Sequence, residues 1–290
     1  PVPVRRRVAD MNQFRPMNIR YETAYKPFRS ILERTIILIV PFLFFSGMAF
    51  AQVNSPAVGK LSDDLAKKAK TLNPQYLVFS PEKTPDGTVP LVIYLHGAGG
   101  VGDNIQKIRG QAGQVWKGIE KFKKSPCIVV APQASKKARE NGGWVPDDLN
   151  ILLGHLKATL KVDEKRIYLT GNSMGGYGSW VWGGHNPEHF AAIAPVSGGI
   201  GPGGPKDVTP DVDKWAANLA KVPVFAFAGG KDRVVPAERS QRMIAAIQKA
   251  GGKEAKIRIH PNEGHGAGRV VFGSAEFYEW MFSKKQDSAQ

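Results

Sequence analysis

One short segment, residues 166–176, constrains the fold of this chain more than any other. An apolar, β-branched run enters a Gly-x-Ser-x-Gly turn there, and a helix-compatible stretch, 175–182, follows. A strand, a sharp turn and a helix in this order are what a nucleophile elbow requires. The turn strains the backbone of Ser173, and a Cβ at Gly171 or Gly175 would clash with a neighbouring strand or helix. The pattern predicts that Ser173 projects from a strand end, beside a helix N-terminus whose dipole favours negative charge.

Strand and helix patterns alternate on both sides of this turn. Strand-like apolar runs occupy 127–132, 166–170, 191–196, 222–228 and 255–259, and helix-like segments occupy 104–123, 149–161, 237–250 and 275–283. Nearly continuous apolar strands separated by helices indicate a parallel sheet that is covered on both faces. A length of 290 residues with 42% apolar content suits one large domain of this kind. We predict an α/β fold with a mostly parallel, twisted sheet, formed by residues 52–290 as a single domain.

Before this alternation, the patterns are less regular. Residues 57–72 show amphipathic spacing and predict a helix. Two strands, 75–79 and 89–95, are expected on either side of the turn Pro85-Asp86-Gly87.

The first 51 residues have the features of a secretory signal. A basic lead ends at Arg34, an apolar run occupies 35–45, and Ala49-Phe50-Ala51 supplies a small-x-small ending. A membrane anchor is the competing interpretation, but an uncharged run of roughly 17 residues is short for a span, and Pro41 interrupts it. We predict cleavage after Ala51, and an exported, periplasmic or extracellular protein with no stable membrane anchor after processing.

Charge and cysteine content limit the other classes of function. The net charge is +15, yet the basic residues are dispersed and do not interleave with aromatic residues, so we expect a solvated surface and no nucleic-acid partner. The only cysteine, Cys127, lies in the apolar run 126–131, which favours a buried strand residue over a nucleophile. No segment resembles a metal site or a phosphate-binding loop, so we expect neither a metal nor a cofactor.

Two further polar residues follow predicted strands in the order Ser, Asp, His. Asp232 follows strand 222–228 in a Gly-Gly-Lys-Asp loop, and His265 follows strand 255–259 in a glycine-flanked loop. Parallel strands place such loops at one edge of the sheet. A serine hydroxyl is a weak nucleophile, so His265 would accept its proton, and Asp232 would fix the tautomer of the imidazole. Asp147, Asp148 and Glu263 are the alternative acids. Four other histidines fit structural roles: His155, His185, His189 and His260.

A fourth strand end carries the small-residue sequence His96-Gly97-Ala98-Gly99-Gly100. Small residues let the backbone approach a substrate and direct amide hydrogens at an oxyanion. We expect the amide of Ala98 to be one donor, with Gly97 or Gly99 as alternatives, and the amide of Met174 to be the second. His96 and Gly99 are candidates for the wall of a substrate pocket. Trp144 is a third candidate for the pocket wall, although an aromatic residue in a loop as often only covers the core. Gln133, which ends another predicted strand, is a similar candidate.

These motifs resemble those of the secreted esterase branch of the α/β-hydrolase superfamily, close to the "predicted peptidase" and polyhydroxybutyrate-depolymerase/feruloyl-esterase-like groups. The resemblance covers roughly residues 75–284, and it rests on the following stretches: 95–99, 167–180, 194–199, 229–236 and 264–265. It implies a carboxylic-ester hydrolase that works through an acyl-enzyme, with Ser173, Asp232 and His265 as the triad and with Met174 and the Ala98 region as the oxyanion hole.

The resemblance is incomplete in two places. Many relatives have a polar residue and an aromatic residue after the histidine, whereas this chain has Gly266-Ala267-Gly268. The short loop 198–205 offers little material for a large lid, so we expect no lipase-type interfacial activation.

The leading functional hypothesis is a secreted serine esterase acting on small acyl esters or on ester side chains of polysaccharides. An acyltransferase with the same triad is the main alternative, because only the acceptor distinguishes the two reactions. A peptidase is disfavoured because no substrate-gating domain fits in the chain. A catalytically silent binding protein would be expected to lack a triad group, and all three are present. Sequence patterns of this kind leave the oligomeric state open.

Overall fold

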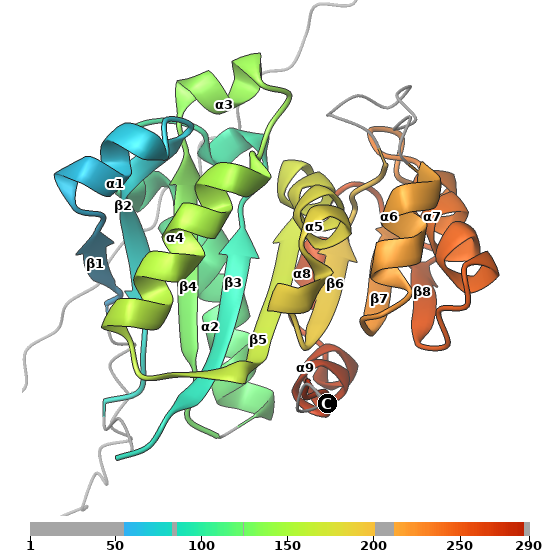
Figure 1. Cartoon of the computed structure of the whole chain (residues 1–290). Helices are drawn as coiled ribbons and strands as arrows, with labels where there is room; N and C mark the ends of the chain where they lie inside the picture. Colours follow the sequence, from blue (N-terminus) through green and yellow to red (C-terminus); the bar gives the residue numbers. More distant parts are fainter. Residues whose placement is uncertain (1–54, 83–85, 124, 201–211, 287–290) are drawn as a thin grey trace, which may run out of the picture. The chain divides into compact units, whose positions relative to one another are not determined.

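An eight-stranded sheet forms the centre of the fold in the computed structural model of the chain (Figure 1). The structure describes residues 55–82, 86–123, 125–200 and 212–286. The strand order is β1-β2-β4-β3-β5-β6-β7-β8. The first three strands in this order pair antiparallel, and every pair from β4–β3 to β7–β8 is parallel. The expected α/β fold with a mostly parallel sheet is therefore confirmed.

The strands and helices alternate along the chain after the first two strands. The strands are β1 (Ala57–Lys60), β2 (Leu72–Phe79), β3 (Val89–Leu95), β4 (Ile128–Ala134), β5 (Val162–Asn172), β6 (Ala192–Val196), β7 (Val224–Gly229) and β8 (Ala255–His260). The helices are α1 (Asp63–Lys68), α2 (Arg109–Phe122), α3 (Lys136–Glu140), α4 (Pro146–Thr159), α5 (Met174–His185), α6 (Val212–Leu219), α7 (Glu238–Lys249), α8 (Gly268–Val271) and α9 (Ala275–Phe282). Short 3-10 turns are η1 (Ala98–Gly100), η2 (Ile105–Ile108) and η3 (Pro187–His189).

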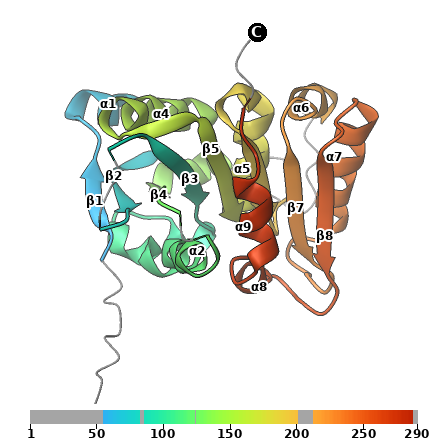
Figure 2. The same cartoon turned by 90° about the horizontal axis from the view of Figure 1, so that it is seen from below.

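Helices cover both faces of the sheet, and a separate apolar core fills each interface. Figure 2 shows α1, α4, α5, α6 and α7 on one face and α2, α8 and α9 on the other. Strand β3 is buried on both faces because its side chains alternate between the cores: Leu91 and Ile93 face one core, and Val92 and Tyr94 face the other. This double burial explains why the central strands read as continuous apolar runs in the sequence.

The single helix predicted over 57–72 is wrong. Strand β1 pairs antiparallel with β2, with Ala57 opposite Val78, and the helix is confined to α1. The side chain of Ser62 accepts a hydrogen bond from the amide of Leu65 and so caps α1. Main-chain pairing at the edge of the sheet therefore overrides the helical spacing of the apolar residues in this segment.

Strands β2 and β3 lie before and after residues 85–87 as expected, but they are not neighbours in the sheet. Strand β4 lies between them, so β2 pairs with β4 rather than with its neighbour in the sequence. Two predictions lie outside the described residues: the signal segment 1–51 with its cleavage site, and most of the loop 198–205 that bears on a lid. Of the described helices, none has the length and apolar character to span a membrane.

Cys127 is buried immediately before β4, as its apolar surroundings in the sequence indicate. Burial raises the pKa of its thiol to about 12. The thiolate is therefore scarce at neutral pH, and Cys127 is unsuited to nucleophilic chemistry.

Candidate active site

Ser173 occupies a strained turn between β5 and α5. Its backbone angles are φ 58° and ψ −117°, a combination that a non-glycine residue adopts only when the surrounding structure enforces it. The amide of Ser173 donates to the carbonyl of Val196 at 3.0 Å, which anchors the turn to the next strand. A Cβ on Gly171 would overlap the carbonyl group of Gly175, and one on Gly175 would overlap the carbonyl of Leu95. Both positions require glycine because the main chains of β3, β5 and α5 lie too close together there for a side chain.

The three residues predicted as a triad lie in one hydrogen-bonded chain. Ser173 Oγ is 2.8 Å from His265 Nε2, and His265 Nδ1 is 2.9 Å from Asp232 Oδ2. An ionised carboxylate can only accept, so Nδ1 carries the hydrogen, and Nε2 is free to accept the serine proton. The elements β5, β7 and β8 are parallel, and the three loops that follow them bring these side chains to the same edge of the sheet.

Asp232 is held from two sides. Its Oδ1 accepts the amides of Val234 and Val235, each at 2.9 Å, while Oδ2 bonds to His265. The carboxylate is fully buried, whereas the imidazole of His265 is 31% exposed. A buried carboxylate with three donors is fixed in position and weakly screened, so it can stabilise a neighbouring imidazolium.

The alternative acids lie elsewhere. Asp148 accepts the backbone amide and the hydroxyl of Thr71, both at 2.6 Å, and so ties α4 to the start of β2. Asp147 is exposed on the first turn of α4. Glu263 receives the amide of Lys231 through its main-chain carbonyl, at 2.8 Å. Among these carboxylates, Asp232 is the one that contacts His265.

Several peptide groups of the loop after β3 are hydrogen-bonded within the described part of the protein, and the amide of Ala98 is not among them. The carbonyl of Gly97 accepts from His96 Nδ1 at 2.7 Å and from the amide of Gly100 at 2.9 Å. The carbonyl of Ala98 accepts from Val101 at 3.3 Å and from Arg139 at 3.2 Å. Within the described residues, no hydrogen bond uses the amide of Ala98. Bonds to the Gly97 carbonyl polarise the shared peptide group, so they strengthen the Ala98 amide as a donor.

Gly97 cannot serve as the alternative donor in this arrangement. Its amide donates to the side-chain oxygen of Gln111 on α2, at 3.1 Å. Gly99 is exposed, with open space where its Cβ would be, and no hydrogen bond among the described residues uses its amide, so Gly99 stays an alternative donor. Met174 is the first residue of α5, a position where the amide has no acceptor within the helix. Sequence reasoning missed Gln111, because no motif distinguishes it from the other polar residues of its helix.

His96 is a predicted pocket residue, but the structure buries its side chain beneath the loop instead. The ring is fully buried. Its Nε2 accepts the amide of Ala134 at 3.0 Å, so Nδ1 bears the hydrogen that is donated to Gly97. Burial lowers the pKa of His96 to about 4, so the ring is neutral at physiological pH. His96 therefore supports the loop from below and has no face available to a substrate.

Trp144 is also mainly a supporting residue, since it is 5% exposed. Its indole nitrogen donates to the carbonyl of His96 at 3.3 Å, and its ring would block a Cβ on Gly178 of α5. Gln133 has a comparable function, because its side-chain nitrogen donates to the carbonyl of Gly100 at 2.8 Å. Among the described residues there is no group of three or more His, Cys, Asp or Glu side chains that could hold a metal ion.

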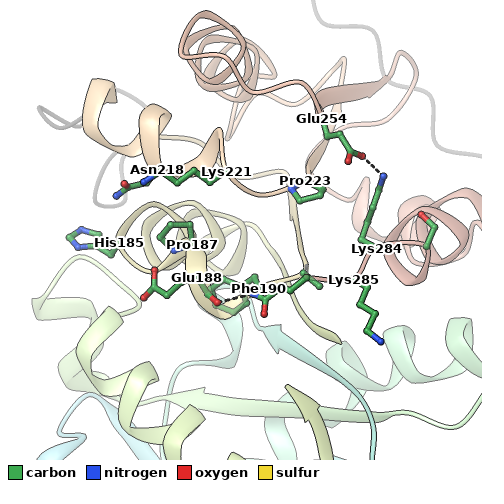
Figure 3. A pocket seen from close by; sticks show the side chains of 13 residues that line it. His185, Pro187, Glu188, Phe190, Asn218, Lys221, Pro223, Glu254, Lys284 and Lys285 are labelled. Atoms are coloured by element: carbon green, nitrogen blue, oxygen red, sulfur yellow. Dashed lines mark hydrogen bonds and ion pairs between the residues drawn. The ribbon is translucent and has the colours of Figure 1, made fainter. Parts of the chain in front are cut away.

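A pocket of about 790 Å³ lies at the opposite edge of the sheet. Figure 3 shows its wall, which includes residues just before β6, β7 and β8: Phe190, Pro223 and Glu254. Lys284 reaches across to form an ion pair with Glu254. None of the predicted site residues lines this pocket.

Comparisons with known proteins place the chain in a family of hydrolases. The family model described as "Dienelactone hydrolase family" matches residues 75–269. A protein named "Putative carboxymethylenebutenolidase" from Methylorubrum extorquens is 32% identical over 127 residues, which cover 42% of this chain and 40% of the relative. A "Probable feruloyl esterase C" from Aspergillus niger is 26% identical over 180 residues, covering 59% of this chain and 62% of the relative.

Solved structures give a similar result. The structure described as "Crystal Structure of a Thermostable Esterase" superposes with a TM-score of 0.64 at 27% identity, and the match covers 81% of this chain and 64% of that one. The chain spans about two fifths of the length of the first curated relatives that it matches.

Proposed function

Because this chain belongs to the dienelactone hydrolase family, we propose that it is a serine carboxylic-ester hydrolase that works through an acyl-enzyme. The observation that carries the proposal is the hydrogen-bonded chain from Ser173 through His265 to Asp232. The similarity to an esterase of known structure supports the same reaction class.

In the proposed mechanism, Ser173 Oγ attacks the ester carbonyl while its proton passes to His265 Nε2. The imidazolium that forms is stabilised by Asp232, which lies 2.9 Å from Nδ1. His265 then returns the proton to the alkoxide leaving group as the tetrahedral intermediate collapses to the acyl-enzyme. Water then attacks the acyl-enzyme while His265 accepts its proton. His265 returns this proton to Ser173 Oγ as the acid leaves, which restores the serine.

The amides of Ala98 and Met174 would stabilise the oxyanion of each tetrahedral intermediate. Ala98 begins η1 just after β3, and Met174 begins α5 just after β5, the strand that pairs with β3. Fixed amides stabilise developing charge without reorganisation, and one such donor is worth about 3 kcal/mol of barrier.

For the substrate, we propose small acyl esters or ester side chains of polysaccharides, including feruloyl esters. The similarity to a "Probable feruloyl esterase C" supports this class. A panel of nitrophenyl, feruloyl, acetyl-sugar and polyester substrates would rank the acyl and alcohol groups. Analysis of the products in water with an added alcohol separates hydrolysis from acyl transfer, because a transferase would yield mainly the new ester.

We also propose that the protein is exported, on the basis of the basic lead, apolar core and small-x-small ending within residues 1–51. Mass spectrometry of protein recovered outside the cytoplasm should give an N-terminus at Gln52. Intact leader on protein that remains in the membrane would contradict this proposal.

Labelling with a fluorophosphonate tests the catalytic proposal directly. The wild-type protein should be modified at Ser173 and should lose activity in proportion to labelling. Absence of an adduct on correctly folded protein would favour a catalytically silent binding protein instead.

A further inference from the structure

We infer that Gln111 is a positioning residue for the oxyanion loop, and that its side-chain oxygen sets the position of the Ala98 amide relative to Ser173. The inference rests on the proposed ester hydrolysis. It adds a function for α2, a helix that supplies none of the triad residues.

Gln111 is hydrogen-bonded to Gly97, the residue of the oxyanion loop that lies against the nucleophile elbow. Its Oε1 accepts the amide of Gly97 at 3.1 Å. A Cβ built on Gly97 would lie 3.3 Å from the carbonyl oxygen of Asn172, 3.5 Å from the Cβ of Ser173 and 3.7 Å from Gln111 Oε1. Gly97 is thus close both to the elbow and to the amide head of Gln111.

The orientation of the Gln111 amide follows from the chemistry of the bond. A main-chain amide can only donate, so the group that faces Gly97 must be the oxygen. The helix that carries Gln111 is itself fixed, because the neighbouring residues Ala112 and Val115 are fully buried in the core between α2 and the sheet. The acceptor is therefore presented to Gly97 from a rigid element.

This contact matters because Gly97, as a glycine, does not fix its own backbone angles. Without a Cβ, its backbone has a wide range of accessible angles. Gln111 restrains the amide on one side of Gly97, and His96 restrains its carbonyl on the other, at 2.7 Å. With both held, the peptide group that carries the amide of Ala98 is fixed, and this amide is free to donate to an oxyanion.

The test compares Gln111→Met and Gln111→Ala with Gln114→Met, a change one turn further along the same helix, where Gln114 is exposed. Methionine keeps the length of glutamine and removes the acceptor. We would measure kcat and KM for a nitrophenyl ester, the inhibition constant of a small alkyl trifluoromethyl ketone, and Tm. The ketone forms a tetrahedral adduct on the serine and places its oxyanion where the substrate would.

Both Gln111 variants should lower kcat on the order of tenfold, because a small displacement of a catalytic group is costly, and should weaken the ketone by a similar factor. KM should stay within about twofold, since ground-state binding is unaffected. Gln114→Met should match the wild type.

The inference is overturned if both Gln111 variants keep wild-type kcat and ketone affinity, or if KM and Tm change while kcat and ketone affinity do not. An inactive or unlabelled wild-type protein would instead refute the proposed function, so the two failures can be told apart.

Discussion

The two edges of the sheet differ in a way that identifies the site. At the amino edge, a pocket of about 790 Å³ is lined by charged side chains such as Lys284 and Glu254, which neutralise each other. At the carboxyl edge, Ser173 and His265 are joined to a fully buried carboxylate, and the Ala98 amide lacks a protein acceptor within the described residues. The difference shows that a pocket by itself is poor evidence for a catalytic site. Buried polar groups held in fixed orientations are better evidence.

The largest difference between the edges should appear when a serine is removed from each. Ser173→Ala should lower kcat/KM roughly 10⁵- to 10⁶-fold, because the nucleophile is lost, and should leave the fold intact. Ser283→Ala, in the wall of the amino-edge pocket, should keep wild-type kcat/KM. Steady-state kinetics and circular dichroism provide the measurements. Turnover at the wild-type rate in the Ser173 variant would mean that the nucleophile is assigned to the wrong residue.

The next largest effect is expected at the acid. In Asp232→Asn, the amide oxygen should keep the donors Val234 and Val235, so the new NH₂ group faces His265 Nδ1. The imidazole is then forced into the tautomer that cannot accept the serine proton, and kcat should fall roughly 10⁴-fold at neutral pH.

A matched change supplies the control for this acid. Asp147→Asn alters an exposed carboxylate that was an alternative in the sequence, and kcat should be unchanged. Equal losses in the two variants would rule out a specific role for Asp232.

Dense packing at the carboxyl edge gives a third prediction. Gly175→Ala places a methyl group on the carbonyl of Leu95, so the free energy of unfolding should fall by about 3 kcal/mol or more. Gly154→Ala on α4 meets open space and should instead raise stability by about 0.5–1 kcal/mol. Urea titrations compare the two. A stable, active Gly175→Ala protein would show that the elbow can relax.

A fourth prediction concerns pH and the neutral ring of His96. Its pKa is about 4 in the folded protein, below the ordinary value of 6.5, so the unfolded chain binds a proton more readily. The stability that this ring contributes is fully present above pH 6.5 and is lost as pH falls to about 4. The loss is at most about 3 kcal/mol. His96→Gln should flatten the dependence of Tm on pH in this window. An unchanged slope would show that His96 is not responsible.

The smallest effect is expected at the amino edge. Lys284→Met breaks the ion pair with Glu254, whose side chain is 53% exposed, so stability should change by less than about 1 kcal/mol. Ester hydrolysis should be unaffected. A large loss of activity would contradict the view that the amino edge takes no part in catalysis.

Much of the fold could be predicted because the central strands are buried on both faces and bounded by glycine-rich turns. Strand β3 was predicted with its observed bounds, Val89–Leu95. The segment 57–72 failed because its apolar spacing fits a helix, while the partner of β1 lies further along the chain. Ser62, followed by two acidic residues, is the cap signal that could have located α1.

The site shows the same division between local and tertiary information. The order of Ser173, Asp232 and His265 is readable because each follows a strand of one parallel sheet, and the structure brings the three together. The burial of His96 and the contact of Gln111 with Gly97 depend on how helices and loops pack, and no residue pattern encodes them. Sequence reasoning finds the reacting groups more readily than the residues that hold them.

The buried thiol of Cys127, the only cysteine in the sequence, can report local unfolding around the start of β4. Because the sulfur is 1% exposed and its pKa is raised to about 12, an alkylating reagent meets it only in molecules where the start of β4 has separated from its neighbours. The alkylation rate of the unaltered protein would therefore measure how often the sheet opens at the start of β4, without any introduced probe.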